Sequence, residues 1–375
     1  MIATNKTDII ETDQAAPIFQ VSNYTEGEEP DIVNLLMREM SGWPFHNIKC
    51  SPLEHWMWKH IDSPTGLMNV VVARSHGKIV GCNHSHTNSA KIFEKNIPSE
   101  ISCDLAVHSD YRKMGIYKNM SDLCLEKSIK LGITFGYWIT VNPILINQAK
   151  KLNRPTPPFQ LAKLVWINNI EEYLKERQAS NILLKKTLFQ IKTNLLQIIY
   201  KTKRSSDYNI RDITFFGNDA ELFWSKISPR FDLIIERNQE YLNYRYCDSR
   251  AGNYTIKAVY RHEDMLGFCV LDLTQGNQAK ILDFMTLPGE NDAADMLLLH
   301  VLDYIVENKR NSVILWVVDD SEFYKIFSRN NFFKAKDIGP HLYFNSRVVE
   351  MEEWDKLQSL NPDRVHFVLG DTDIC

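Results

Sequence analysis

No two cysteines are spaced as Cys-x-x-Cys, although the chain of 375 residues has seven cysteines. That spacing is typical of zinc ribbons and thioredoxin-like centres, so neither is predicted. The odd count also argues against a complete set of disulfides, and some cysteines lie in apolar runs, such as Val80-Gly81-Cys82. We therefore expect buried, reduced thiols and a cytoplasmic protein.

Long apolar runs are missing as well. No window of about 18 uncharged apolar residues occurs, so no transmembrane segment is predicted. The first residues carry acids where a signal peptide needs an apolar stretch. The formal net charge is only −4, from 43 basic and 47 acidic residues, so we expect no general binding to nucleic acids.

Three well-known site motifs are also absent. The chain lacks Gly-x-Ser-x-Gly, which leaves a serine hydrolase unsupported. It lacks Gly-x-Gly-x-x-Gly and Gly-x-x-x-x-Gly-Lys-Ser/Thr, which mark dinucleotide and nucleoside-triphosphate sites. Function must therefore be inferred from weaker patterns.

Composition and length describe a globular protein of two domains. Hydrophobic residues make up 44% of the chain and charged residues 24%. We predict a flexible N-terminus at 1–17, a first domain at 18–175, a linker at 176–206 and a second domain at 207–375. Alternating apolar patterns in the first domain predict strands at 19–24, 68–74, 79–86, 100–107 and 135–141. Apolar residues at helical spacing predict one helix that begins near residue 30 and two more at 52–61 and 117–131.

The predicted linker contains a basic amphipathic segment. Residues 181–204 carry six Lys or Arg residues and no acid, with Leu and Ile at helical spacing. One interpretation is a linker helix that packs its apolar stripe on the domains. The other is docking to an acidic partner, such as an acyl carrier protein or an anionic membrane surface.

The two domains show an internal repeat. Residues 58–81 align without gaps on 244–267, with five identities where about one or two are expected by chance. The identical pairs are Asp62/Asp248, Ser63/Ser249, Gly66/Gly252, His76/His262 and Gly81/Gly267. At a shifted offset, Asp104 corresponds to Asp283, and the helix 117–131 to a helix at 293–306. The sequence therefore predicts one fold used twice.

One turn distinguishes the halves. After the strand that ends at Val107 comes Tyr-Arg-Lys-Met-Gly-Ile-Tyr, residues 111–117, whereas the second half has Glu290-Asn-Asp-Ala-Ala. A helix start leaves backbone N–H groups without partners and carries positive partial charge. Gly115 allows close approach of an anion, and Arg112 and Lys113 add charge. Such a turn suits a phosphate or pyrophosphate.

The stretch from Ile101 to Tyr117 resembles the central motif of the GCN5-related N-acetyltransferases (GNAT), a strand, an Arg-x-x-Gly turn and a helix. The resemblance implies an α/β (α+β) fold: two tandem GNAT-like domains, each a mixed, mostly antiparallel sheet flanked by helices, the second degenerate. It implies acetyl-CoA or another acyl-CoA as donor. It assigns the pantetheine arm to Leu105, Ala106, Val107 and Asn142, and the pyrophosphate to Arg112, Lys113, Met114, Gly115, Ile116 and Tyr117.

The sequence departs from the family pattern at three places. Ser109-Asp110 stands where a Pro is usual, and Tyr117 stands where a small residue is usual. The later helix, around 146–154, has no Tyr that could act as general acid. The group that protonates the leaving thiolate is therefore unassigned.

Acyl transfer from a thioester to an amine needs a base, donors to the carbonyl oxygen and an acid, but no nucleophilic side chain. The candidates for catalysis are Asp104, which shares a strand face with Ala106, and His108, which directly follows the strand. His84 and His86 lie on one face of a strand and are candidates to line an acceptor pocket. We predict no metal site.

Together these patterns predict an acyl-CoA-dependent N-acyltransferase, most simply an acetyltransferase, whose acceptor is a small primary amine such as an amino sugar or amino acid. One alternative is a transferase that takes its acyl group from an acyl carrier protein, through the segment 181–204, or from an aminoacyl-tRNA. The other is a non-catalytic acyl-CoA-binding or scaffold protein.

Overall fold

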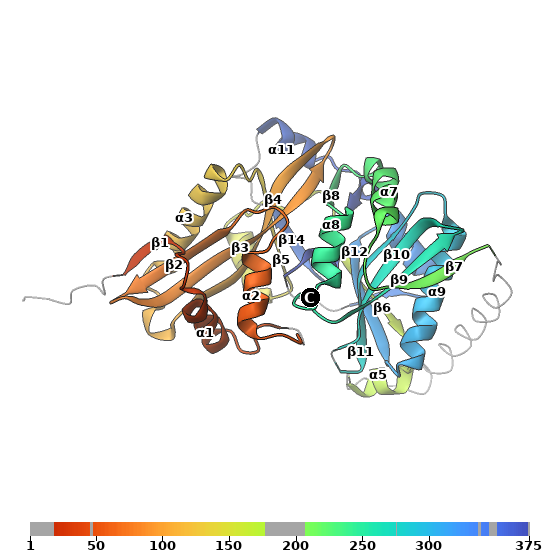
Figure 1. Cartoon of the computed structure of the whole chain (residues 1–375), viewed down its shortest axis with the longest axis horizontal. Helices are drawn as coiled ribbons and strands as arrows, with labels where there is room; N and C mark the ends of the chain where they lie inside the picture. Colours follow the sequence, from red (N-terminus) through yellow and green to blue (C-terminus); the bar gives the residue numbers. More distant parts are fainter. Residues whose placement is uncertain are drawn as a thin grey trace, which may run out of the picture.

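The computed structural model describes residues 19–45, 48–176, 207–274, 276–336, 339–344 and 351–373. Two sheets, here named sheet A and sheet B, lie side by side along the long axis of the molecule (Figure 1). The predicted flexible segment 1–17 and the basic segment 181–204 lie outside the described residues. The proposed docking of that segment therefore stays a prediction.

Sheet A belongs mainly to the first half of the chain. Its strands follow the order β1-β2-β3-β4-β5-β14, and β8 joins β3 on one side and β15 on the other. Only the pairs β4–β5 and β8–β15 are parallel. The strands are β1 (Gln20–Asn23), β2 (Asn69–Ser75), β3 (Lys78–Ile92), β4 (Lys95–Val107), β5 (Phe135–Thr140), β14 (His341–Phe344), β8 (Leu233–Ile235) and β15 (Val365–His366).

Sheet B repeats this plan in the second half. Its order is β13-β6-β12-β11-β10-β9-β7, with only β11 and β12 parallel. The strands are β7 (Asn209–Ile213), β9 (Tyr254–Arg261), β10 (Asp264–Asp272), β11 (Gln278–Thr286), β12 (Ser312–Val318), β6 (Leu161–Ile167) and β13 (Phe333–Lys334). The predicted fold class, two mostly antiparallel sheets flanked by helices, is confirmed.

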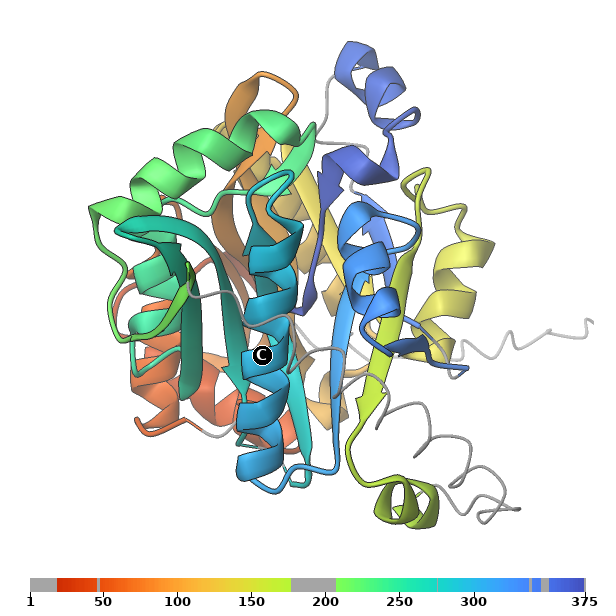
Figure 2. The same ribbon diagram turned by 90° about the vertical axis from the view of Figure 1, so that its right-hand side faces the viewer.

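Helices cover both faces of sheet A. The helices α1 and α2 bury their apolar sides on one face, around Trp56, and α3 packs on the other through Ile116 and Met120. On sheet B, α9 lies across the outer face when the molecule is viewed from that end (Figure 2). The helices are α1 (Glu29–Glu39), α2 (Pro52–His60), α3 (Ile116–Lys130), α4 (Pro143–Lys151), α5 (Ile170–Glu176), α7 (Asn218–Ile227), α8 (Gln239–Leu242), α9 (Asn291–Glu307), α10 (Glu322–Arg329) and α11 (Met351–Leu357).

Local sequence explains where α2 begins. Pro52 occupies the first turn, where its missing N–H costs nothing. The Ser51 hydroxyl accepts a bond from the Glu54 backbone N–H, and the Glu54 carboxylate accepts one from the Ser51 N–H. This capping box fixes the helix that carries Trp56, Lys59 and His60.

The two halves exchange strands: the first half gives β6 to sheet B, and the second half gives β14, β8 and β15 to sheet A. β6 follows the first-half elements in the chain, yet it pairs antiparallel with β12 of sheet B. In return, β14 from the second half pairs antiparallel with β5 of sheet A. A buried apolar cluster that includes Ile101, Phe135, Leu161, Val318 and Phe344 fills the junction between the sheets. The halves therefore share a core rather than a simple linker.

The structure also explains two glycines of the internal repeat. A Cβ on Gly81 would lie 3.1 Å from Ile116 Cγ2, so α3 packs closely on β3 because this residue has no side chain. A Cβ on Gly267 would lie 2.5 Å from the Met285 carbonyl oxygen. Both glycines therefore serve packing within their own halves.

No helix among the described residues is long and apolar enough to cross a membrane.

Candidate active site

The turn between β4 and α3 is open to solvent. Arg112, Lys113, Met114 and Gly115 are exposed, and α3 begins at Ile116 with no side-chain cap on its first N–H groups. Gly115 has φ +83°, a conformation that glycine adopts without strain, and a Cβ placed there meets no atom within 4 Å. A 15-residue helix thus offers its free N-terminal amides at a surface that a large anion can reach.

The arginine of this turn is engaged within the protein. Its guanidinium forms an ion pair of 2.7 Å with Glu39, the last residue of α1, and its Nε donates to the Val107 carbonyl at 3.2 Å. The Arg112 side chain is 55% exposed, so an arriving ligand can reach it, whereas the Glu39 side chain is only 7% exposed and also pairs with Arg38. The ion pair between Arg112 and Glu39 therefore links the turn to α1, which lies with α2 on the face of sheet A opposite to α3.

The strands β4 and β5 part beside this turn. Their parallel ladder covers only Ser99 to Ile101, paired with Phe135 to Tyr137. Beyond it, β4 continues its pairing with β3 as far as Val107, while β5 pairs with β14. Among the described residues, the edge of β4 from Ser102 to Val107 on the β5 side therefore has no partner strand, and we name this region where the two strands part the gap. Such an edge can pair with the amides of an extended ligand.

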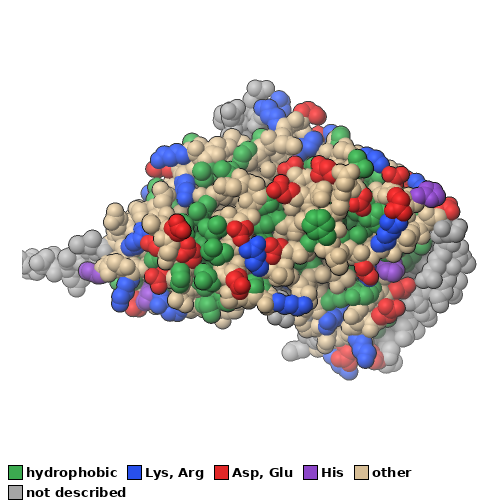
Figure 3. All heavy atoms as spheres, viewed as in Figure 1, with side chains coloured by type: hydrophobic (Ala, Val, Ile, Leu, Met, Phe, Trp, Pro, Cys, Tyr) green, Lys and Arg blue, Asp and Glu red, His purple; other side chains and the backbone are tan. Residues whose placement is uncertain are grey.

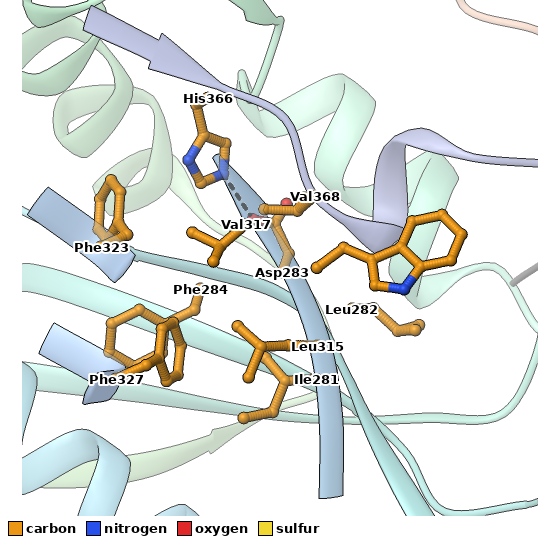
Figure 4. Close-up of a pocket in the computed structure, with 11 residues that line it drawn as sticks. Ile281, Leu282, Asp283, Phe284, Leu315, Val317, Phe323, Phe327, His366 and Val368 are labelled. Atoms are coloured by element: carbon orange, nitrogen blue, oxygen red, sulfur yellow. Dashed lines mark hydrogen bonds and ion pairs between the residues drawn. The ribbon is translucent and has the colours of Figure 1, made fainter. Parts of the chain in front are cut away.

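The second half closes the corresponding gap with its own chain. The ladder between β11 and β12 also ends early, at Lys280–Ile314. His366 and Val368 of the segment from Val365 to Asp373, here named the closing segment, pack between the two strands (Figure 4). A cavity of only about 10 Å³ remains there. It is lined by eleven residues, among them Phe284, Leu315, Phe323 and His366. The second half thus lacks the Arg-x-x-Gly turn, and the closing segment fills the region where its strands part.

Asp104 lies at the centre of a buried polar cluster under α2. Two residues of β4, Asp104 and Leu105, stand opposite one residue of β3, and this bulge gives Asp104 a φ of +44°. Its carboxylate accepts bonds from Trp43 Nε1 at 2.8 Å, Lys59 Nζ at 2.8 Å and His60 Nε2 at 3.2 Å. Burial alone would raise the pKa of the Asp104 carboxyl, but Lys59 and His60 hold it well below its usual range.

The two histidines predicted to line an acceptor pocket lie beside this cluster. His84 is fully buried: its Nε2 accepts from Trp56 Nε1 at 3.1 Å, so its Nδ1 donates to the Asp104 carbonyl at 2.7 Å. Burial lowers the pKa of His84 to about 4, which keeps the ring neutral. His86 lies 3.2 Å from the hydroxyl of Tyr244, which comes from the second half.

The same cluster contains residue types that bind metals. Ligand atoms of His60, Cys103 and Asp104 lie within 4.8 Å of one another. However, the Lys59 ammonium already lies 2.8 Å from Asp104 Oδ2 and is itself buried. A metal ion would be placed against this cation, so the donor set fits an internal ion pair better than a metal.

The remaining predicted residues lie at the ends of the gap. His108 caps the short helix η1 (Ser109–Tyr111), and its Nδ1 accepts from the Asp110 N–H at 3.2 Å. Asn142 caps α4 through a bond from the Ile144 N–H at 2.9 Å and stands just beyond β5. Ala106 is buried under α1 and α2, whereas Leu105 is 39% exposed.

Sequence reasoning missed several residues of the polar cluster. Trp43, Lys59, His60 and Tyr244 come from three separate parts of the chain, and only folding brings them to Asp104 and His86. The repeat did contain one signal. Lys59 aligns with Arg245, so both halves have a basic residue at this position, and both residues are buried. Lys59 and Arg245 both contact residues of the closing segment.

Comparisons with known proteins agree with this geometry. Residues 20–143 match a family model described as acetyltransferase (GNAT) domain. The match covers β1 to β5 and therefore includes the open turn and the gap. It confirms the predicted GNAT domain in the first half of the chain. No curated protein sequence gives a match.

Solved structures show the same fold at low sequence identity. A probable N-acyltransferase from Enterococcus faecalis is 10% identical with a TM-score of 0.53, covering 80% of this chain and 66% of its own. A GCN5-related N-acetyltransferase from Anabaena variabilis is 9% identical with a TM-score of 0.57, covering 87% and 72%. N-myristoyltransferase from Saccharomyces cerevisiae, solved with myristoyl-CoA, is 11% identical with a TM-score of 0.57, covering 92% and 85%. This chain thus spans just under two thirds of the first of these proteins.

Proposed function

We propose that this protein is an acyl-CoA-dependent N-acyltransferase whose first half binds the donor and whose two halves together bind a small primary amine. One observation carries the proposal: β4 and β5 part after Ile101, and the unpaired edge of β4 leads to the uncapped start of α3. The corresponding gap of the second half is filled by the closing segment.

The donor fits this arrangement from end to end. The N–H groups at Gly115 to Tyr117 suit the pyrophosphate, and the edge of β4 at Leu105 to Val107 suits the amides of the pantetheine arm. Tyr117 is 51% exposed, so its bulk does not fill the turn. With the pyrophosphate at the turn, the thioester lies toward the other end of the gap, near Cys103 and Asp104.

The length of the acyl group is the finer part of the proposal. Acetyl-CoA is the simplest donor. Exposed apolar side chains at Leu105, Val141, Ile144 and Leu145 come from the strands and helix that border the gap, and the yeast neighbour was solved with myristoyl-CoA. We therefore include octanoyl-CoA and myristoyl-CoA among the donors to be tested.

The residues predicted as catalytic have different surroundings. His108 follows Val107 and so lies at the pyrophosphate end of the strand. Asp104 lies at the thioester end, but its carboxylate already accepts three hydrogen bonds. We propose that Asp104 positions β4 through its bulge, and that His84 and His86 support the acceptor side. Amino sugars and amino acids remain the proposed acceptors.

The test combines binding with turnover. Calorimetry with acetyl-CoA, octanoyl-CoA and myristoyl-CoA should show one donor site for each chain. The release of free thiol should then depend on an added amine, with glucosamine and lysine as the first acceptors. Binding without amine-dependent thiol release would favour the alternative of a non-catalytic acyl-CoA-binding protein. The absence of binding would refute the proposed donor site.

A transferase that depends on a carrier protein is the remaining alternative. The segment that suggested it, 181–204, lies outside the described residues, and nothing in the comparisons supports such a partner. Charge reversal at Lys185, Lys186 and Lys192 tests it, because only transfer from an acidic carrier protein should then be lost. Transfer from free acyl-CoA should be unchanged.

A further inference from the structure

The closing segment reaches both halves of the molecule. Its strand β15 pairs with β8, and its short helix η5 (Leu369–Asp371) follows. Asp371 forms an ion pair of 2.6 Å with Arg237, which also binds Asp283, the repeat counterpart of Asp104. Two residues later, Asp373 Oδ2 lies 4.0 Å from Lys59 Nζ, the cation that binds Asp104. The segment therefore places one carboxylate beside each of two equivalent centres.

We propose that Asp373 is the catalytic residue that accepts the proton of the acceptor amine. The assignment rests on the proposed N-acyltransferase function and names a base that the sequence motif does not contain.

Asp373 differs from Asp104 in the properties that a base needs. The Asp104 side chain is 1% exposed and bound by three donors, so a substrate can neither reach it nor easily add a proton. The Asp373 side chain is 19% exposed and lies beyond ordinary hydrogen-bond distance from Lys59. Of these two carboxylates beside Lys59, Asp373 is the one that a substrate can reach.

Burial of the Asp373 carboxyl favours proton uptake, against the effect of two nearby cations. Lys59 faces it from α2, Asp104 and Cys103 from β4, and Arg245 from the helical turn η3 (Asn243–Cys247). Burial raises the pKa of the Asp373 carboxyl above its ordinary value, and Asp104 raises it further, while Lys59 and Arg245 oppose the rise. A carboxylate with a raised pKa is a stronger base toward an ammonium group.

Asp373 also lies beside the part of β4 where we place the thioester. Lys59 links it to Asp104, which directly precedes the segment Leu105 to Val107. The ladder between β4 and β5 ends at Ile101, so the inner end of the gap lies at this level. In Figure 1 the helices α2 and α8 lie on the facing sides of the two halves. The face that carries these helices mixes acidic, basic and apolar side chains (Figure 3).

The step balances as follows. The acceptor arrives as an ammonium ion and transfers one proton to the Asp373 carboxylate. The neutral nitrogen attacks the thioester carbonyl, a C–N bond forms, and the C–S bond breaks with its electron pair on sulfur. The nitrogen of the new amide releases a second proton, which converts the thiolate to the free thiol. Asp373 then returns its proton to solvent. The products are an amide, free coenzyme A and one proton.

The test compares two acceptors of different basicity. Lysine is an ammonium ion at neutral pH and needs a base, whereas methoxyamine is already uncharged and does not. We expect Asp373→Asn to lower kcat/KM for lysine by about 10²- to 10⁴-fold. With methoxyamine it should stay within about threefold of the wild type. Asp373→Glu should restore part of the activity with lysine.

A matched control separates chemistry from structure. Asp363→Asn removes an exposed carboxylate just before the closing segment, paired only at the surface with Lys325, and should behave as the wild type. Calorimetry with acetyl-CoA should give equal donor affinity for all variants. An equal loss with both acceptors, or unchanged activity with lysine, would overturn the assignment of Asp373. If the wild type itself transferred to no amine, the proposed function would fail, and this assignment with it.

Discussion

Replacing Gly115 by alanine tests the donor site, and Gly132→Ala provides a matched control. The two glycines flank the same helix, α3, at its start and just after its end. Both have positive φ, +83° and +71°, and a Cβ at either position meets no atom within 4 Å. The two substitutions therefore impose the same kind of backbone strain and no steric overlap within the protein.

The strain sets the expected loss of stability. An L-residue in the left-handed region costs about 1–2 kcal/mol, so both variants should lose about that much unfolding free energy. For units of the size of these halves, this corresponds to a melting temperature lower by about 2–8 °C. Because neither Cβ has a neighbour, no packing cost should be added, and the two variants should have similar stability.

Donor binding should separate the two variants. In Gly115→Ala the added methyl group lies where the pyrophosphate approaches the backbone. The loss of one hydrogen bond between an amide and a charged group costs about 1.5–3 kcal/mol, or about 10- to 150-fold in affinity. Gly132→Ala lies at the far end of a 15-residue helix and should bind as the wild type. Calorimetry with acetyl-CoA measures both values. Equal affinity of the two variants would refute the location of the pyrophosphate at this turn.

Three further predictions concern the surroundings of the site. Asp104→Asn should lower the unfolding free energy at pH 7 by about 3–5 kcal/mol, because it leaves the buried Lys59 ammonium without its carboxylate. The folded-state pKa of Asp104 is lowered, so its contribution to stability is complete above the unfolded-state pKa of about 4 and is lost as the pH falls through the folded-state pKa. Urea unfolding at pH 7 and pH 3 should therefore show a weaker acid dependence of stability for the variant than for the wild type. Glu39→Gln should tighten acetyl-CoA binding by about two- to fivefold in calorimetry, because it releases Arg112 from its ion pair with this residue. Unchanged or weaker binding would contradict this role. Gly267→Ala should cost about 1–3 kcal/mol in urea unfolding, and more than Gly81→Ala, because its Cβ would lie 2.5 Å from a backbone oxygen rather than 3.1 Å from a side chain; the reverse order would contradict the packing argument.

The sequence by itself predicted the local elements of the first half, including the strand, turn and helix of the motif that we propose binds the donor. Alternation and helical spacing predicted these strands and helices, because each depends on neighbours within a few residues. The predicted strands 79–86 and 100–107 were too short, since β3 extends to Ile92 and β4 begins at Lys95. The turn at Arg112 to Gly115 was recognisable for the same reason: its function needs only a strand end, a glycine and a helix start in series. The repeat likewise predicted the second sheet.

Only the tertiary structure decided how the halves combine. The exchange of β6 and β14 between the sheets leaves no local signature, because a strand's own sequence is equally compatible with either sheet edge. The polar cluster around Asp104 and the approach of Asp373 to Lys59 join residues far apart in the chain, such as Lys59 and Asp373. Local spacing carries no information about such contacts. The sequence thus determined the strand, turn and helix of the motif, and folding alone determined which carboxylate is buried in an ion pair and which is partly exposed.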